Sequence, residues 1–190
     1  MAKLTIQSAG PGLTIQDLGR PGWKAQGLST GGAADPLALL EGAALLGVKP
    51  DQAVIEMMGF GGVFTVDEGS RIALTGAVML AEIDGTQLAH NATHFLPAGA
   101  KLTIRSAQKG VYGYRRLAGG IATYPVMGSR AAHLTAGIGA RLQAGDTLPL
   151  GEDTDRMHAP QKLPTDDRFA GGTVRIMSGP QTDFFDQRTQ

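Results

Sequence analysis

The stretch Arg71-Ile72-Ala73-Leu74-Thr75-Gly76-Ala77-Val78 is a short apolar run with a single glycine inside it. Short apolar runs bounded by turn residues are typical of buried strands. The chain contains 28 glycines and 10 prolines, which are scattered along it and not gathered into one segment. Many tight turns between short apolar runs are typical of a β-barrel or a β-sandwich. The sequence therefore predicts a mainly β protein.

Similar patterns on both sides of this stretch predict the other strands. Alternating apolar and polar residues, or short apolar runs, predict strands at residues 4–7, 13–15, 54–58, 63–66, 71–75, 78–83, 101–105 and 110–117. The pair Asp84-Gly85 lies between apolar flanks and predicts a hairpin turn of type I′. Regularly punctuated strands favour a closed or nearly closed sheet.

One helix is predicted, at residues 35–46. Asp35 is a suitable N-cap, Pro36 suits the first helical position, and Gly47 suits the exit. Helical spacing of apolar residues places the expected buried stripe at Leu37, Leu40, Ala44 and Leu45.

The composition narrows the class of protein. With 190 residues and 42% hydrophobic residues, the chain can bury one substantial core. It carries 17 basic and 17 acidic residues without a basic block, which argues against nucleic-acid binding. It has no cysteine, so disulfides, thiolate catalysis and thiolate metal sites are excluded. Neither a membrane-spanning apolar run nor the apolar core of a signal peptide is present, so we expect a cytoplasmic protein.

The character of the sequence changes after residue 150. Residues 152–172 are rich in charge, proline and glycine and have almost no apolar periodicity, which is typical of an exposed linker. A new strand is predicted at Thr173–Met177, and residues 181–190 are polar and could form a helix. We expect one domain at residues 1–150, a linker at 151–172, and the first element of a truncated second β domain at 173–190.

The stretch at residues 14–23 places an amide, a carboxylate and a guanidinium beside a turn rich in glycine and proline. These groups belong to Gln16, Asp17 and Arg20. Because glycine and proline interrupt regular structure, we expect the three side chains at the end of a strand and on its turn. An Asp17–Arg20 ion pair that only pins this turn is the structural alternative.

An ordered series of short motifs, beginning with this stretch, resembles the allophanate-hydrolase-subunit-2 family. The family is also called the biotin-dependent carboxyltransferase-like family, and it includes the C subunit of 5-oxoprolinase. The other motifs are Gly31-Gly32-Ala33-Ala34-Asp35-Pro36, Ile55-Glu56, Ile72-Ala73-Leu74-Thr75-Gly76-Ala77, Leu117-Ala118-Gly119-Gly120-Ile121, Gly128-Ser129-Arg130, Arg141-Leu142, Gly145-Asp146 and Gly179-Pro180-Gln181. They correspond to the N-terminal part of the family's length.

The resemblance implies a cyclophilin-like barrel with one short helix, followed by the start of a second β domain. It also implies a component of an ATP-dependent complex acting on a small amide, most directly 5-oxoprolinase, which converts 5-oxoproline to glutamate. One alternative is the carboxyltransferase module of a urea carboxylase or allophanate system, which would use a biotin-carried carboxyl group. Another is a non-catalytic protein that binds a kinase inhibitor. No cofactor is assigned to the chain itself, because ATP would be used by the whole complex.

Candidate site residues are the polar side chains that these motifs place near turns. Amide hydrolysis or carboxyl transfer needs a cation or amide dipoles to hold an anionic group, and a base to take a proton. The predicted catalytic residues are Asp17, Arg20 and Glu56, and the predicted substrate-binding residues are Gln16, Asp35 and Arg130. Asp35 could be only a helix cap, and Glu56 could be a paired structural carboxylate or a base with a raised pKa. No metal site is predicted, because His90 and His94 lack a third ligand.

Some motif positions differ from the family pattern. Gly31 stands where many members have serine, Arg115-Arg116 replaces apolar residues, and Ala132 replaces a threonine. Several of the lost side chains are polar and lie on turns, which leaves open a different substrate or a weaker activity.

The resemblance also implies partners. The family's site is thought to lie where the C and B subunits meet, so we expect B-like and A-like proteins of the same complex as partners. A strand at Thr173–Met177 without a neighbour would also seek a partner. A second copy of the chain is the other candidate partner, and neither nucleic acid nor a membrane is expected.

Overall fold

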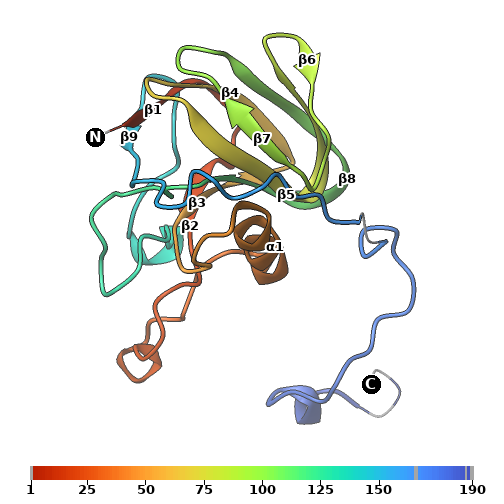
Figure 1. Cartoon of the computed structure of the whole chain (residues 1–190). Helices are drawn as coiled ribbons and strands as arrows, with labels where there is room; N and C mark the ends of the chain where they lie inside the picture. Colours follow the sequence, from red (N-terminus) through yellow and green to blue (C-terminus); the bar gives the residue numbers. More distant parts are fainter. Residues whose placement is uncertain (1, 165–166, 187, 189–190) are drawn as a thin grey trace.

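The computed structural model describes residues 2–164, 167–186 and 188, and it confirms a mainly β protein (Figure 1). The strands are β1 (Lys3–Ala9), β2 (Thr14–Gln16), β3 (Val54–Met58), β4 (Phe60–Val66), β5 (Ser70–Ile83), β6 (Thr86–Gln87), β7 (Thr93–Leu96), β8 (Leu102–Leu117) and β9 (Thr147–Pro149). The only α-helix among the described residues is α1 (Pro36–Leu46). Short 3₁₀ turns are η1 (Lys24–Gln26), η2 (Leu134–Ala136) and η3 (Thr182–Phe184).

The strands form one curled antiparallel sheet. Its main path is β2-β3-β8-β4-β1-β9, and β5 pairs with β6, β7 and β8. Strands β5 and β8 each join two segments that the sequence predicted separately, because register shifts between Gly76 and Ala81 let the paired strands bend without ending. Figure 1 shows the sheet curving around an interior, as in an incompletely closed barrel.

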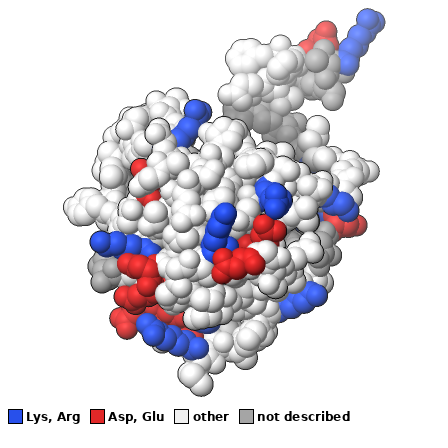
Figure 2. Space-filling model, turned by 90° about the horizontal axis from the view of Figure 1, so that it is seen from above, with Lys and Arg blue, Asp and Glu red and all other residues white. Residues whose placement is uncertain are grey.

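The interior of the curled sheet holds the main core. Its largest contributors come from the first strands and from β5 and β8: Leu4, Ile6, Ile55, Phe64, Ile72, Leu74, Leu102 and Ile104. The hairpin between β5 and β6 is the predicted type I′ turn, because Asp84 and Gly85 both have left-handed φ angles of 47° and 84°. On the face drawn in Figure 2, basic and acidic side chains are interspersed over a larger uncharged surface.

Helix α1 begins and ends as predicted. The Asp35 side chain accepts a hydrogen bond from the backbone N–H of Ala38 at 3.1 Å, and Gly47 closes the helix in the left-handed conformation. The helix lies against β5 and β8 on the outer side of the sheet (Figure 1). No helix in the described part of the chain is long and apolar enough to cross a bilayer.

The predicted buried stripe of α1 is wrong at three of its four residues, and only Leu45 is buried as predicted. Leu37 and Leu40 are 49% and 47% exposed, and Ala44 is exposed as well. The buried residues are Ala38, Leu39, Gly42, Ala43, Leu45 and Leu46. Apolar residues surround this helix on nearly every side, so their spacing could not decide which side faces the sheet. The small residues decide it, since they let the helix lie close to the strands.

Beyond β9, the described residues form no helix or strand except the short turn η3. The strand predicted at Thr173–Met177 is absent, and Val174, Ile176 and Met177 are 80–91% exposed. A strand needs a neighbour for its backbone hydrogen bonds, and none of the described strands lies beside this segment (Figure 1). Of the helix predicted at residues 181–190, only η3 is seen, and residues 187, 189 and 190 lie outside the described residues. The domain boundaries at 150 and 172 stay a prediction.

Two neighbouring arginines of β8 are buried in different surroundings. Arg115 is 0% exposed and stacks on the Phe64 ring at 4.2 Å. Its three guanidinium nitrogens have no hydrogen-bond partner among the described residues, and burial lowers its pKa to about 9. Arg116 instead donates hydrogen bonds of 3.2 Å to the carbonyl oxygens of Leu39, Lys49 and Pro50.

This contrast gives a test of stability. We expect Arg115→Met to leave the free energy of unfolding unchanged or to raise it by up to about 4 kcal/mol, because an uncompensated buried charge is removed. Arg116→Met should lower it by about 1–3 kcal/mol, because buried carbonyls lose their donors. Urea unfolding of both variants makes the comparison, and a clear loss of stability in Arg115→Met would contradict it.

Candidate functional site

Three segments meet beyond the end of β2 and form what we call the turn cluster: residues 16–20, 29–35 and 126–133. The backbone N–H of Ala33 donates to Asp17 O at 2.9 Å, and the N–H of Arg20 donates to Thr30 O at 2.8 Å. These bonds close the base of a loop that carries η1 and projects from the body of the molecule (Figure 1). The first two segments are therefore fixed to one another although no sheet continues there.

Two glycines allow this close approach. A Cβ atom at Gly32 would lie 2.8 Å from the backbone nitrogen of Gly19, and one at Gly19 would lie 2.6 Å from Thr30 O. Both glycines also have left-handed φ angles, of 83° for Gly19 and 90° for Gly32. The turn cluster depends on glycine at both positions.

The Asp17 carboxylate joins the first segment to the third. Asp17 is 6% exposed. Its Oδ1 accepts from the Gly19 N–H at 2.8 Å and from Ser129 Oγ at 2.7 Å, and its Oδ2 accepts from the Arg130 N–H at 2.6 Å. Ser129 Oγ in turn accepts from the Ala131 N–H at 3.0 Å. Asp17 thus uses its charge to satisfy donors in two loops.

Arg20 is 1% exposed and points to backbone oxygens. Its Nε donates to Val126 O at 3.5 Å, and its Nη2 donates to Ala131 O. Its Nη1 is buried and has no acceptor among the described residues. The alternative of an Asp17–Arg20 ion pair is wrong, because each side chain binds the third segment and no such pair forms in the part of the chain described.

Gln16 and Arg130 lie beside these two residues. Gln16 Nε2 donates to Thr14 Oγ1 at 3.2 Å and to Ala132 O at 3.3 Å, whereas its buried Oε1 lacks a donor among the described residues. Arg130 Nε donates to Thr123 O at 2.6 Å. Arg130 also lines a cavity of about 220 Å³ that is bordered by Arg141 and Asp146.

Glu56 fixes the second segment to the sheet. Its Oε2 accepts from the Tyr114 hydroxyl at 2.7 Å and from the Ala34 N–H at 2.8 Å. The same hydroxyl accepts from the Asp35 N–H at 2.7 Å. Burial raises the pKa of Glu56, and these two hydrogen bonds oppose the rise. The pKa of Tyr114 is also raised, by burial and by the Glu56 carboxylate. Oε1 of Glu56 receives no hydrogen bond from the described residues.

Asp35 serves as the helix cap that the sequence offered as an alternative role. Its Oδ1 caps α1, and its Oδ2 lies 3.3 Å from Arg168, which also pairs with Glu41 at 2.6 Å. The structure therefore brings five of the six predicted site residues to the turn cluster, and Glu56 reaches it from β3.

One pair of site residues was missed by the sequence prediction. Ser29 Oγ lies 2.7 Å from Nε2 of His133, although the two residues are 104 positions apart. Nδ1 of His133 accepts from the Ala136 N–H at 3.3 Å, so neutral His133 carries its proton on Nε2 and donates it to Ser29. A motif search could not find this contact, because only the fold brings the two loops together.

Metal ligation has no support in the described residues, where no group of three or more His, Asp or Glu side chains could hold an ion. His94 lies on β7 and its Nε2 is 2.8 Å from Ala89 O, which is a backbone contact.

The chain matches, over residues 26–190, the family described as carboxyltransferase domain, subdomain A and B. It belongs to this family. It is 34% identical to the C subunit of 5-oxoprolinase from Escherichia coli K12, over 98% of this chain and 61% of that protein. The chain thus spans about three fifths of the length of that relative.

Solved structures agree on the fold. The crystal structure of TTHA0988 in space group P212121 superposes with a TM-score of 0.87 at 27% identity, over 95% of this chain and 36% of that one. The Kluyveromyces lactis urea carboxylase gives a TM-score of 0.75 at 23% identity, over 78% of this chain and 14% of that one. The resemblance and the cyclophilin-like, carboxyltransferase-type fold expected from the motifs are confirmed.

The raised pKa of Glu56 predicts how the stability of the protein changes with pH. Folding favours the protonated carboxyl, so this contribution to stability is full below the ordinary pKa of 4.5 and is lost as pH rises through the raised value. The stability of the wild type relative to Glu56→Gln should therefore grow as pH falls from neutral toward 4.5. Urea unfolding at several pH values measures it.

Tyr114→Phe supplies the directional control. It removes a hydrogen bond that favours the charged carboxylate, so it should raise the pKa of Glu56 further and steepen the same trend. A relative stability that does not change with pH in either comparison would contradict this account of Glu56.

Proposed function

We propose that this chain corresponds to the C subunit of an ATP-dependent complex that converts 5-oxoproline to glutamate. The observation that carries the proposal is the similarity to the C subunit of E. coli 5-oxoprolinase along nearly the whole chain. ATP would be used by the complex, and the cytoplasm is the location that suits such a metabolic enzyme.

In this proposal the turn cluster binds the substrate carboxylate beside Gly31, where a side chain is missing. A Cβ atom there would lie 3.7 Å from Arg20 Nη1 and 3.0 Å from the His133 ring. An oxygen held near this position is attracted by the charge of the Arg20 guanidinium, which lies buried behind it. Ser29 receives its own hydrogen bond from His133, so its hydroxyl hydrogen is free to point to the substrate.

Glu56 is the proposed base. Its Oε2 is held by Tyr114 and by a backbone N–H, which leaves Oε1 to take a proton from the reacting amide or from water. A raised pKa suits a carboxylate that must accept a proton. Asp17 takes a positioning role, because its oxygens already accept three hydrogen bonds. Gln16, Asp35 and Arg130 stay candidates for substrate contact.

Reconstitution of the chain with its A-like and B-like partners, ATP and 5-oxoproline tests these roles. Ser29→Ala should raise KM about tenfold with kcat largely retained, because a substrate hydrogen bond is lost. Glu56→Gln should lower kcat by a factor of about 10²–10⁴. The matched control is Ser106→Ala, at an exposed serine outside the turn cluster, which should behave as the wild type. Normal turnover by Glu56→Gln would exclude it as the base.

The second candidate function is carboxyl transfer within a urea carboxylase or allophanate system, favoured by the description of the matching family. The same turn cluster would then hold a carboxyl group delivered on biotin, and the substrate would be urea or a related amide. Supplying the chain with a carboxylated biotin carrier in place of the A-like and B-like partners separates the two reactions.

The proposed complex needs an interface, and exposed apolar side chains of α1 and of residues 18–23 offer it. These are Leu37 and Leu40 of α1, Leu18 of the turn cluster and Trp23 of the projecting loop, which are 37–49% exposed. We propose that the B-like partner covers them and completes the site. A stable interface should bury at least about 1,000 Å² in total.

Light scattering with and without the B-like partner tests this interface. Leu40→Asp should weaken the complex by about 2 kcal/mol or more, because a charge replaces a buried anchor. Leu80→Asp, at a leucine of β5 that is 42% exposed against 47% for Leu40, is the control and should leave binding unchanged. The proposal is wrong if the chain stays monomeric and does not bind the B-like partner at micromolar concentration. A homodimer that is weakened by Leu40→Asp would show that a second copy of the chain is the partner.

A further inference from the structure

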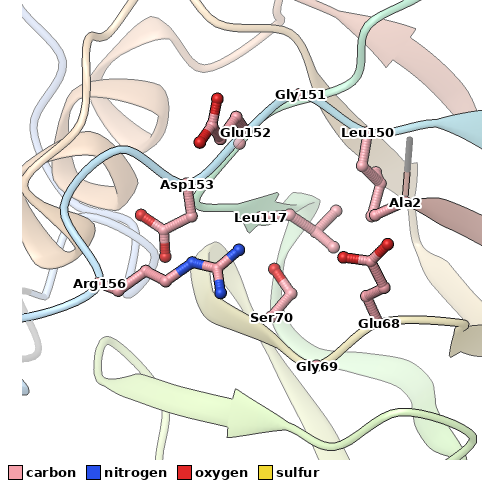
Figure 3. A pocket seen from close by; sticks show the side chains of 11 residues that line it. Ala2, Glu68, Gly69, Ser70, Leu117, Leu150, Gly151, Glu152, Asp153 and Arg156 are labelled. Carbon is pink, nitrogen blue, oxygen red and sulfur yellow. The ribbon is translucent and has the colours of Figure 1, made fainter.

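A cavity of about 420 Å³ lies apart from the turn cluster, where the start of β5 meets the end of β8 and the segment after β9 (Figure 3). None of the residues that line it belongs to the turn cluster. Its lining includes the buried leucines Leu117 and Leu150. Its rim carries Glu68, Ser70, Glu152 and Arg156.

The wall of this cavity is held firmly. The Arg71 guanidinium binds both oxygens of Asp153, at 2.8 and 2.6 Å, and donates from Nη1 to Leu46 O at 2.9 Å. This hydrogen-bonded pairing lowers the pKa of Asp153. Two backbones also touch, since a Cβ at Gly119 would overlap the carbonyl oxygen of Gly151 and one at Gly151 would overlap that of Gly119. The residues after β9 are therefore fixed against β8.

The remaining charged side chains of the rim are exposed, and the charge of Arg156 helps to lower the pKa of Asp153. Asp153 is neutralised by Arg71, whereas Glu68, Glu152 and Arg156 form no ion pair with any residue that the structure describes. Figure 3 shows the Arg156 guanidinium and the Glu68 carboxylate on opposite sides of the cavity, with Ser70 and Leu117 between them. The guanidinium of Arg156, which lies beside Asp153, is thus separated from the Glu68 carboxylate by Leu117 and Ser70.

We infer that this cavity binds a small aliphatic α-amino acid. The ligand carboxylate would meet Arg156, its ammonium group would meet Glu68, and its side chain would lie over Leu117 and Leu150. A carboxylate alone would leave Glu68 without a cation, and an amine alone would make no use of the Arg156 guanidinium. The volume of about 420 Å³ exceeds that of such a ligand and leaves room for water. The site is independent of the reaction proposed for the turn cluster.

Isothermal titration calorimetry of the full chain with three matched ligands tests the inference. L-leucine carries both charges, 4-methylpentanoate lacks the amino group, and 3-methylbutylamine lacks the carboxylate. We expect leucine to bind at least about tenfold more tightly than either analogue, because only leucine satisfies both sides of the cavity. The inference would be overturned if no binding is detected at about 10 mM leucine, or if either analogue binds as tightly as leucine.

Variants assign the contacts. Arg156→Gln should weaken leucine binding about tenfold and leave 3-methylbutylamine unaffected, whereas Glu68→Gln should weaken both. Both side chains are exposed, so folding should be retained, and circular dichroism checks it. Arg105→Gln replaces an exposed arginine outside this cavity and is the control. If Arg156→Gln binds leucine with wild-type affinity, Arg156 does not contact the ligand carboxylate.

Discussion

The Asp17 carboxylate is the interaction on which the turn cluster depends. It accepts hydrogen bonds from the N–H groups of Gly19 and Arg130 and from the hydroxyl of Ser129, which lies 112 positions away in the sequence. Loops outside the sheet have no neighbouring strand to satisfy their backbone donors, and a buried donor without an acceptor costs about 1–3 kcal/mol. The Asp17 carboxylate supplies hydrogen-bond acceptors to two loops at once. The loops therefore have a fixed geometry although they form no regular secondary structure.

Glu56, which lies on strand β3, is a second buried carboxylate that accepts hydrogen bonds from neighbouring segments. Its Oε2 accepts from the Ala34 N–H and from the Tyr114 hydroxyl, and Tyr114 accepts from the Asp35 N–H. A strand residue, an aromatic residue from the neighbouring strand and a helix entrance thereby form one chain of hydrogen bonds. The first turn of α1 is placed by this chain as much as by apolar packing, which explains why a helix with small residues on its buried face sits in a defined position.

The strands and the helix ends could be predicted from the sequence, because both depend on neighbouring residues. Asp35 and Gly47 fix the two ends of α1 through local hydrogen bonds and φ angles. The continuity of β5 across Gly76 could not be predicted, because a glycine looks the same in a bulge as in a turn. The buried face of α1 was also out of reach, since apolar residues lie on nearly all its sides and only the sheet distinguishes Leu39 from Leu40.

The candidate site, too, could be predicted from the sequence only in part. Sequence motifs named residues that the fold gathers at the turn cluster, but they could not show how each polar atom is used, and they gave no sign of the Ser29–His133 contact. Most polar atoms of the cluster are satisfied by the protein itself. Arg20 Nη1, Glu56 Oε1 and Gln16 Oε1 are exceptions, and each belongs to a side chain whose other polar atoms are held by backbone or side-chain partners. A group held in this way loses little further freedom when it meets a ligand, so its interaction energy is not spent on ordering the site. The same carboxylates and guanidiniums that stabilise the loops therefore also give the cluster the preorganisation that binding and proton transfer require.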